Sequence, residues 1–227
     1  MNRSMARSNI YNILSLCYTY PDEKVCSWIM GREWIEEMRK AFGVLTDENL
    51  EEYFESFERH LSGEKEEVAL EMSREYTRLF INGFPHVVAP PYGSVYLEKD
   101  GLVFGKTTSG VLQFYHGAGF TLKEEIGDLP DHIAHELEFM EILTGREAQA
   151  TGSEKVRLEE TQMNFLSHYV LSWIPTFCER VRENSKSAFY RTLADLTGDF
   201  IHLEKNYLGV PEEMNSQKSL EAEIRGG

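Results

Sequence analysis

The chain has 227 residues and a formal net charge of −15, from 23 lysines and arginines against 38 aspartates and glutamates. This charge disfavours binding to nucleic acids and to anionic membranes, because their phosphates require a basic protein surface. It favours binding to a basic partner. The three cysteines are widely spaced, and no apolar run approaches the roughly 18 residues of a membrane span. Composition therefore predicts a cytoplasmic protein without a disulfide framework or a structural zinc site.

Apolar residues recur with helical spacing along almost the whole chain. In the first half, helices are expected around residues 10–17, near Trp28, and over 34–38, 46–61 and 64–80, with Thr46 as the cap of the fourth. In the second half, they are expected from 107–109 to 117–119 and over 131–146, 156–173 and 187–206. Pro130 is expected in the first turn of the helix over 131–146. Pro175 should kink or end the helix before it, and residues 148–154 read as a loop. Only residues 94–103 show any of the alternation typical of a strand. We predict one all-α domain over residues 1–210, a helical bundle, followed by a polar tail over 211–227.

The most informative stretch is the end of the fifth expected helix and the proline-rich loop that follows it. Tyr76, Leu79 and Phe80 are spaced i, i+3 and i+4, so they share one helix face. Two adjacent prolines, the second being Pro91, stiffen the loop and hold Tyr92 in a defined place. A rigid aromatic wall of this kind suits the binding of a peptide better than it suits catalysis, so we expect the loop to line a peptide-binding groove.

A second cluster of polar residues lies at the start of the helix expected over 131–146. His132, His135 and Glu136 are placed to share a helix face, and such side chains can bind zinc or iron. The His-Glu-x-x-His pattern of zinc proteases is absent. Asp131 can instead cap the helix, orient His132 or meet a cation.

Gly105, Lys106 and Thr107 raise the alternative of a phosphate-binding loop. Such a loop needs a glycine five positions before Gly105, where this chain has Asp100, so a turn and a helix cap are the simpler interpretation. The alternative function that remains open is a small metal- or nucleotide-dependent hydrolase that uses His132 and its neighbours.

Taken together, these segments resemble the TorD/DmsD (NarJ-like) family of redox-enzyme maturation chaperones. The shared motifs are an aromatic-x-x-Leu-Phe helix end at 76–80, a Pro-Pro-aromatic-Gly-Ser-Val-aromatic loop at 90–96, and a Pro-Asp-His helix start at 130–132 followed by Glu-Leu-x-Phe-Met at 136–140. In this chain Asp131 follows Pro130 directly, where the family pattern has one residue between them. The resemblance covers roughly residues 76–200.

The resemblance implies an all-helical chaperone, not an enzyme, that binds the twin-arginine signal peptide or the apoprotein of a molybdopterin oxidoreductase before export. It implies no cofactor or metal of its own, and it is compatible with a monomer or a domain-swapped dimer. The family's peptide-binding positions match Tyr76, Leu79, Phe80, Pro91, Tyr92, Gly105, Asp131 and His132. We expect Asp131 to meet an arginine of the peptide through charge-assisted hydrogen bonds.

Overall fold

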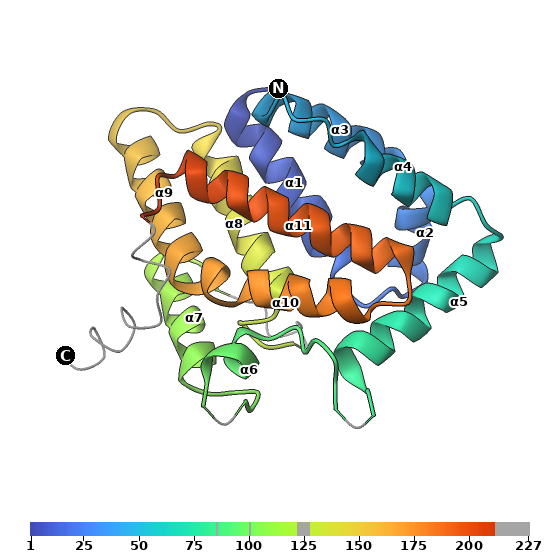
Figure 1. The fold of residues 1–227 in the computed structure, drawn as a ribbon. Helices are drawn as coiled ribbons and strands as arrows, with labels where there is room; N and C mark the ends of the chain where they lie inside the picture. The colour runs from blue at the N-terminus through green and yellow to red at the C-terminus, as the bar shows by residue number, and fades with distance from the viewer. Residues whose placement is uncertain (85, 100, 122–127, 212–227) are drawn as a thin grey trace.

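A computed structural model describes residues 1–84, 86–99, 101–121 and 128–211 of the chain (Figure 1). Its helices are α1 (Arg3–Cys17), α2 (Glu23–Gly31), α3 (Glu33–Leu45), α4 (Glu51–His60), α5 (Lys65–Tyr76), α6 (Gly93–Leu97), α7 (Lys106–Gly117), α8 (Ile133–Glu147), α9 (Gly152–Phe165), α10 (Leu171–Asn184) and α11 (Ala188–Tyr207). Two π-helical turns, η1 (Thr77–Ile81) and η2 (Leu166–Val170), follow α5 and α9. No strand occurs in the described ranges, which confirms the prediction of an all-α fold. Most of the tail predicted over 211–227 lies outside the described residues.

The helices pack in pairs around one continuous hydrophobic core. Helix α1 packs along α8 on one side and along α3 on the other, while α10 pairs with α11, which also contacts α4. The short helix α6 contacts both α7 and α10 (Figure 1). This arrangement places the loop before α6 and the start of α8 at the same end of the bundle.

Aromatic side chains fill much of the core. Trp34 on α3 is buried, stacks on Trp28, and meets Phe57 and Phe189 edge-on at ring-centre distances of 5.0 and 6.4 Å. Edge-on aromatic contacts of this kind add about 0.5–1.5 kcal/mol each beyond the burial of their area. Because the rings come from α2, α3, α4 and α11, they fix the first half of the chain to the last helix.

A buried ionic network ties the first helix to the last ones. Arg7 on α1 donates hydrogen bonds to Glu147 at 2.7 Å, to Glu204 at 2.6 Å and to Gln162 at 2.6 Å. Tyr11 donates to Glu204 at 2.9 Å. These buried groups come from α1, α8, α9 and α11, so a single guanidinium joins four helices. Because a buried charge is costly unless it is paired, the network also disfavours other packings of α1.

Several expected helix boundaries were wrong. Thr46 does not cap α4; its hydroxyl accepts a hydrogen bond from the Glu48 amide in the preceding turn, and Leu50 takes the N-cap position. Pro130 lies before α8 rather than in its first turn, since His132 is the N-cap. Residues 94–103 are not a strand, because α6 occupies the first four of them.

The second half of the chain is also more helical than the sequence indicates. Helix α9 begins at Gly152, inside the stretch expected to be a loop. Pro175 does not end a helix but lies in the fifth position of α10, just after the π-helical turn η2. Proline removes the N–H that would bond the carbonyl four residues earlier, and a π-turn next to it changes the local hydrogen-bond register.

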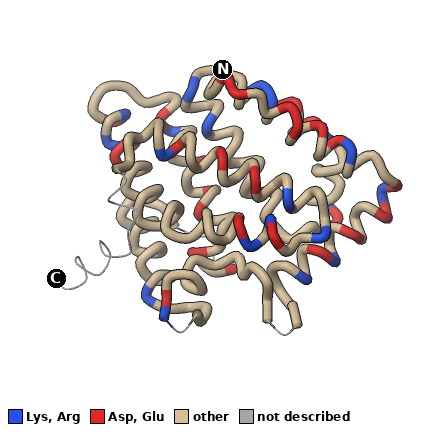
Figure 2. The backbone as a smooth tube through the Cα atoms, in the orientation of Figure 1, with Lys and Arg blue, Asp and Glu red and all other residues tan. Residues whose placement is uncertain are grey.

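Charge is unevenly distributed over the bundle. Figure 2 shows acidic residues concentrated along α3 and α4, where Arg39 is surrounded by Glu36, Glu51 and Glu58. Within the described part of the chain, no helix is long and apolar enough to cross a membrane.

Candidate functional site

The proline-rich loop is joined to the start of α8 by a short antiparallel bridge. The Ile133 amide donates to the Pro91 carbonyl at 2.9 Å, and the Gly93 amide donates to the Asp131 carbonyl at 2.9 Å. This pairs Tyr92 with His132, whose rings lie 5.2 Å apart. The structure therefore brings together two motifs that are separated by about forty residues in the sequence.

Asp131 and His132 cap two different helices. The Asp131 carboxylate accepts a hydrogen bond of 2.8 Å from the Ser94 amide in the first turn of α6. His132 is the N-cap of α8, and its Nδ1 accepts from the Ala134 amide at 3.1 Å. Helix N-termini favour such acceptors because their first amides have no partner within the helix. One dipeptide thus fixes the orientation of α6 relative to α8.

The hydrogen bond at Nδ1 requires His132 to carry its proton on Nε2 and to be neutral. Burial lowers the pKa of His132 to about 4, and His135 acts in the same direction, while Asp128 and Asp131 oppose them. The Asp128 carboxylate lies 3.7 Å from His132 Nε2. The buried imidazole therefore remains uncharged at neutral pH, where its role is capping.

Behind this pair, Trp173 on α10 donates its indole N–H to Glu136 Oε2 on α8 at 3.0 Å. Glu136 is fully buried, and burial raises the pKa of this carboxyl well above its usual range. Gly93 packs on the same tryptophan, since a Cβ at that position would lie 3.0 Å from Trp173 Nε1. The loop, α8 and α10 thus meet at one tryptophan ring.

The residues predicted to line an open groove are mostly buried. Tyr76 and Phe80 contact each other edge-on at 4.8 Å, and Leu79 beside them is fully buried. Tyr76 also donates to the Tyr18 carbonyl at 3.0 Å. The shared helix face is present, but it faces the core, because α5 packs this face against aromatic residues that sequence spacing alone does not locate.

Asp131 is also fully buried, and one of its carboxylate oxygens is engaged by α6. The other oxygen, Oδ1, is buried and has no hydrogen-bond partner among the described residues, so direct contact between Asp131 and an arginine requires access to a buried atom and stays a prediction. The exposed carboxylate of the site belongs instead to Asp128, whose side chain is 39% exposed. Sequence reasoning missed Asp128, since it precedes the motif and becomes part of the site only through the fold.

Asp128 is part of a surface that we call the tyrosine–aspartate surface, formed by Tyr20, Tyr92 and Asp128. Tyr92 is half-buried, and burial together with a hydrogen bond to Asp128 raises the pKa of its hydroxyl. Tyr20 is 47% exposed and meets the Tyr76 ring edge-on at 5.4 Å. The buried motif residue Tyr76 therefore lies directly beneath the exposed Tyr20.

Gly105 lies at the start of α7, and its surroundings do not resemble a phosphate-binding loop. The Glu98 carboxylate accepts from the Thr107 amide at 2.7 Å, and a Cβ on Gly105 would lie 2.5 Å from that carboxylate oxygen. A carboxylate thus already takes the helix amide that a phosphate would need. A Cβ at this position would displace only the end of the flexible Glu98 side chain. Nucleotide binding through residues 105–107 is not supported.

The alternative of a metal-dependent hydrolase is not supported either. His132 precedes α8 as its cap and uses Nδ1 in that role, so it does not share a free helix face with His135 and Glu136. Among the described residues, no group of three or more histidine, cysteine, aspartate or glutamate side chains is placed to hold a metal ion.

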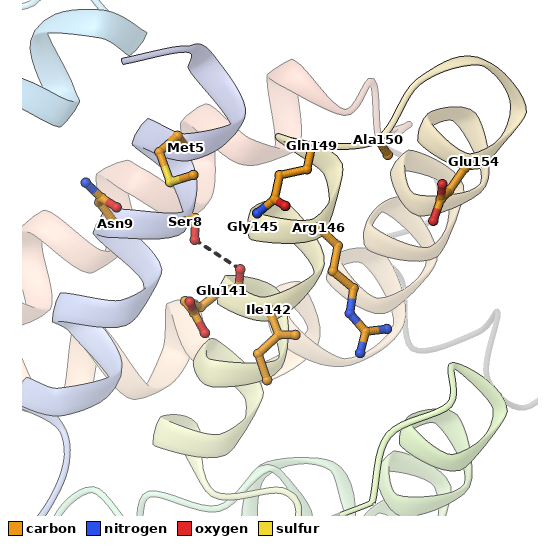
Figure 3. Close-up of a pocket in the computed structure, with 10 residues that line it drawn as sticks. All are labelled: Met5, Ser8, Asn9, Glu141, Ile142, Gly145, Arg146, Gln149, Ala150 and Glu154. Atoms are coloured by element: carbon orange, nitrogen blue, oxygen red, sulfur yellow. Dashed lines mark hydrogen bonds between the residues drawn. The ribbon is translucent and has the colours of Figure 1, made fainter.

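Two hollows lie outside the predicted site. One, of about 550 Å³, is open between α1 and α8 and is lined by Met5, Ser8, Asn9, Glu141 and Arg146 among others (Figure 3). The Ser8 hydroxyl on α1 donates to the Glu141 carbonyl on α8 at 3.2 Å and so joins its two walls (Figure 3). The other, of about 570 Å³, lies between α2 and α5. Neither is lined by the predicted motif residues.

Residues 45–179, which contain the loop, the α6 cap and the Trp173 contact, match the family model described as nitrate reductase delta subunit. The chain belongs to this family. The match includes every residue proposed from the sequence to bind a peptide, and it confirms the NarJ-like resemblance.

Members of the nitrate reductase delta subunit family with similar sequences are named as chaperones. The chaperone protein TorD of Aliivibrio fischeri is 30% identical over 145 residues, which cover 63% of this chain and 67% of that protein. The perchlorate reductase assembly chaperone protein of Dechloromonas aromatica is 27% identical over 222 residues, covering 90% of this chain and 92% of that protein. A crystal structure from Archaeoglobus fulgidus, described as a candidate redox enzyme maturation protein, has 25% identity and a TM-score of 0.56, covering 86% of this chain and 93% of that one.

These relatives place the chain among maturation chaperones of redox enzymes and not among enzymes. The site geometry agrees with this class, because its polar groups cap helices and fix packing. The hydrolase alternative finds no counterpart in the named relatives.

Proposed function

We propose that this chaperone binds the twin-arginine signal peptide of a molybdopterin oxidoreductase in the cytoplasm, and holds the apoprotein until its cofactor has been loaded. The observation that carries the proposal is the tyrosine–aspartate surface, in which the exposed Asp128 carboxylate lies against the half-buried Tyr92. Both share the neighbour Tyr76 with the exposed Tyr20. A guanidinium pairs well with a carboxylate and stacks on a tyrosine face. The net charge of −15 adds long-range attraction for a basic peptide.

In this proposal the motif residues divide into two roles. Tyr92 contacts the peptide together with Asp128, while Tyr76, Leu79, Phe80 and Pro91 form the packed base beneath them. Asp131 and His132 fix α6 and the loop through their capping hydrogen bonds. Gly105 permits the close approach of Glu98 at the start of α7.

Exposed apolar residues on two nearby loops give the peptide or the client further contact area. Phe84 follows η1, and Leu102, Val103 and Phe104 precede α7; all four are exposed, Val103 the least at 44%. Both loops project from the same side of the bundle (Figure 1). Phe104 also has a left-handed backbone with φ of 76°, which is unfavourable for a bulky residue. An exposed and strained phenylalanine does not stabilise the fold, so we assign it to partner binding.

The proposal is tested by calorimetric titration of the full chain with a synthetic peptide that carries an Arg-Arg pair followed by an apolar stretch of alanine and leucine. We expect saturable binding that weakens when the pair is replaced by Gln-Gln. Equal binding of both peptides, or no binding of either, would contradict the proposal.

A further inference from the structure

The hollow between α2 and α5, here called the α2–α5 pocket, has not been given a role above. Its volume is about 570 Å³. One wall comes from α2 along its length and the two residues before it, and the other from the first three turns of α5. Neither wall contains a residue that the sequence motifs single out.

The chemistry of the α2–α5 pocket is amphipathic. Cys26, Met30, Ala69 and Leu70 provide apolar walls, and Leu70 is 50% exposed although it is a large aliphatic residue. Its charged lining residues, here called the rim, are the three carboxylates Asp22, Glu23 and Glu66 and one lysine, Lys65. The rim therefore has a negative balance, which complements an apolar segment that carries basic residues.

The α2–α5 pocket adjoins the tyrosine–aspartate surface at Tyr20. Tyr20 of that surface immediately precedes Pro21, which lines the pocket. Ser73, which also lines the pocket, donates to the Pro21 carbonyl at 3.3 Å and lies one helical turn before Tyr76. A peptide segment bound at Tyr20 therefore lies next to the pocket.

We propose that the α2–α5 pocket holds the apolar stretch that follows the arginine pair of the signal peptide, while the tyrosine–aspartate surface holds an arginine. This inference rests on the proposed function and assigns it a second subsite. Leu70 supplies the main apolar contact, and Glu23 and Glu66 face basic residues that flank the stretch. Because the pocket is preformed, binding orders the peptide and not the chaperone, so the loss of conformational entropy on binding comes from the peptide.

The test is calorimetric titration of full-length variants with the same Arg-Arg peptide. Leu70→Gln removes an exposed apolar side chain without changing charge, and we expect binding to weaken about tenfold. The matched control is Val156→Gln on α9, which is 53% exposed and lies outside the pocket. The control should bind within about twofold of the wild type. Both positions are on the surface, so circular dichroism should show unchanged folding.

A second pair of variants separates local charge from total charge. Glu23→Gln with Glu66→Gln changes two first-turn acids in the pocket rim. Glu52→Gln with Glu154→Gln changes two first-turn acids on α4 and α9 and gives the same net charge. We expect the rim pair to weaken binding more strongly than the control pair.

The outcomes distinguish this inference from the proposed function. If wild-type protein binds the peptide and Leu70→Gln binds it equally well, the α2–α5 pocket is not the subsite, although the proposed function stands. If Leu70→Gln changes only self-association in light scattering, the pocket belongs to a second copy of the chain and the inference is overturned. If the wild type does not bind the peptide, both fail.

Discussion

The Asp131 carboxylate lies 2.8 Å from the Ser94 amide and caps α6 from the neighbouring motif. Asp131→Ala would leave that buried amide without a partner, and we expect a loss of about 1–2 kcal/mol in the free energy of unfolding. Asp131→Asn keeps an acceptor oxygen and should lose less. Urea denaturation at pH 7 measures both. If Asp131→Ala is as stable as the wild type and still loses peptide binding, Asp131 contacts the peptide directly and the capping role is wrong.

The neutral state of His132 predicts a specific dependence of stability on pH. Burial lowers the pKa of His132 to about 4, whereas the ordinary histidine pKa of the unfolded chain is about 6.5. At a pH between these two values, the unfolded chain binds a proton that the folded chain does not bind. The free energy of unfolding should therefore fall as the pH falls through this window. The contribution of His132 is at most about 3.5 kcal/mol, at roughly 1.4 kcal/mol per unit of pKa.

The matched variant is His132→Asn, because asparagine is also a good N-cap but does not titrate. We expect the difference in stability between the wild type and this variant to shift in favour of the variant as the pH is lowered from 7 to 4. Thermal unfolding monitored by circular dichroism across this range measures the shift. A difference that does not change with pH would show that His132 is not held neutral by burial.

Glu136 predicts a dependence of the opposite sign. Burial raises the pKa of its carboxyl, so the folded chain keeps a proton that the unfolded chain releases as the pH rises above the ordinary glutamate value. Glu136→Gln keeps an oxygen for the Trp173 indole and removes the titration. We expect this variant to gain stability relative to the wild type as the pH rises from 5 to 8, as measured by urea denaturation. A constant difference over that range would contradict the argument.

Gly93 has no room for a side chain beside Trp173. A Cβ would lie 3.0 Å from the indole nitrogen, so Gly93→Ala must displace the ring or the loop. We expect a loss of about 1–3 kcal/mol in the free energy of unfolding and a change in tryptophan fluorescence. Gly43→Ala on α3 is the control, because a Cβ there meets no atom within 4 Å. Equal stability of the two variants would show that the loop does not pack on Trp173 as described.

The buried Arg7 network predicts a large effect far from the site. Arg7→Met leaves Glu204 buried without the guanidinium and leaves Glu147 with Lys155, at 3.7 Å, as its cation, and we expect a loss of about 3–5 kcal/mol in the free energy of unfolding. Arg39→Met is the control. Arg39 also contacts three glutamates, but on the surface, where an ion pair contributes at most about 1 kcal/mol. Similar losses in both variants would contradict the assigned difference in burial.

Much of the fold follows from the sequence, since apolar periodicity located α5, α7, α8 and α11 to within a few residues, although it placed the start of α1 seven residues too late. The site followed only in part. Sequence motifs identified Tyr92, Asp131 and His132 as neighbours, and the bridge between them is observed. Spacing alone does not tell a buried helix face from an exposed one, so Tyr76 and Phe80 were expected in an open groove. Asp128 and the Glu136–Trp173 pair depend on tertiary contacts that no local pattern records.

The most direct test of the central claim is a double-mutant cycle between Asp128 and the arginine pair of the peptide. Calorimetry gives the binding free energies of wild type and Asp128→Asn, each with the Arg-Arg peptide and with a peptide in which one arginine is replaced by glutamine. If the tyrosine–aspartate surface receives an arginine, Asp128→Asn and the replacement of that arginine should be coupled by about 1 kcal/mol or more. We expect this coupling for one of the two arginine positions of the peptide. Strictly additive losses at both positions would show that Asp128 and the arginines do not meet.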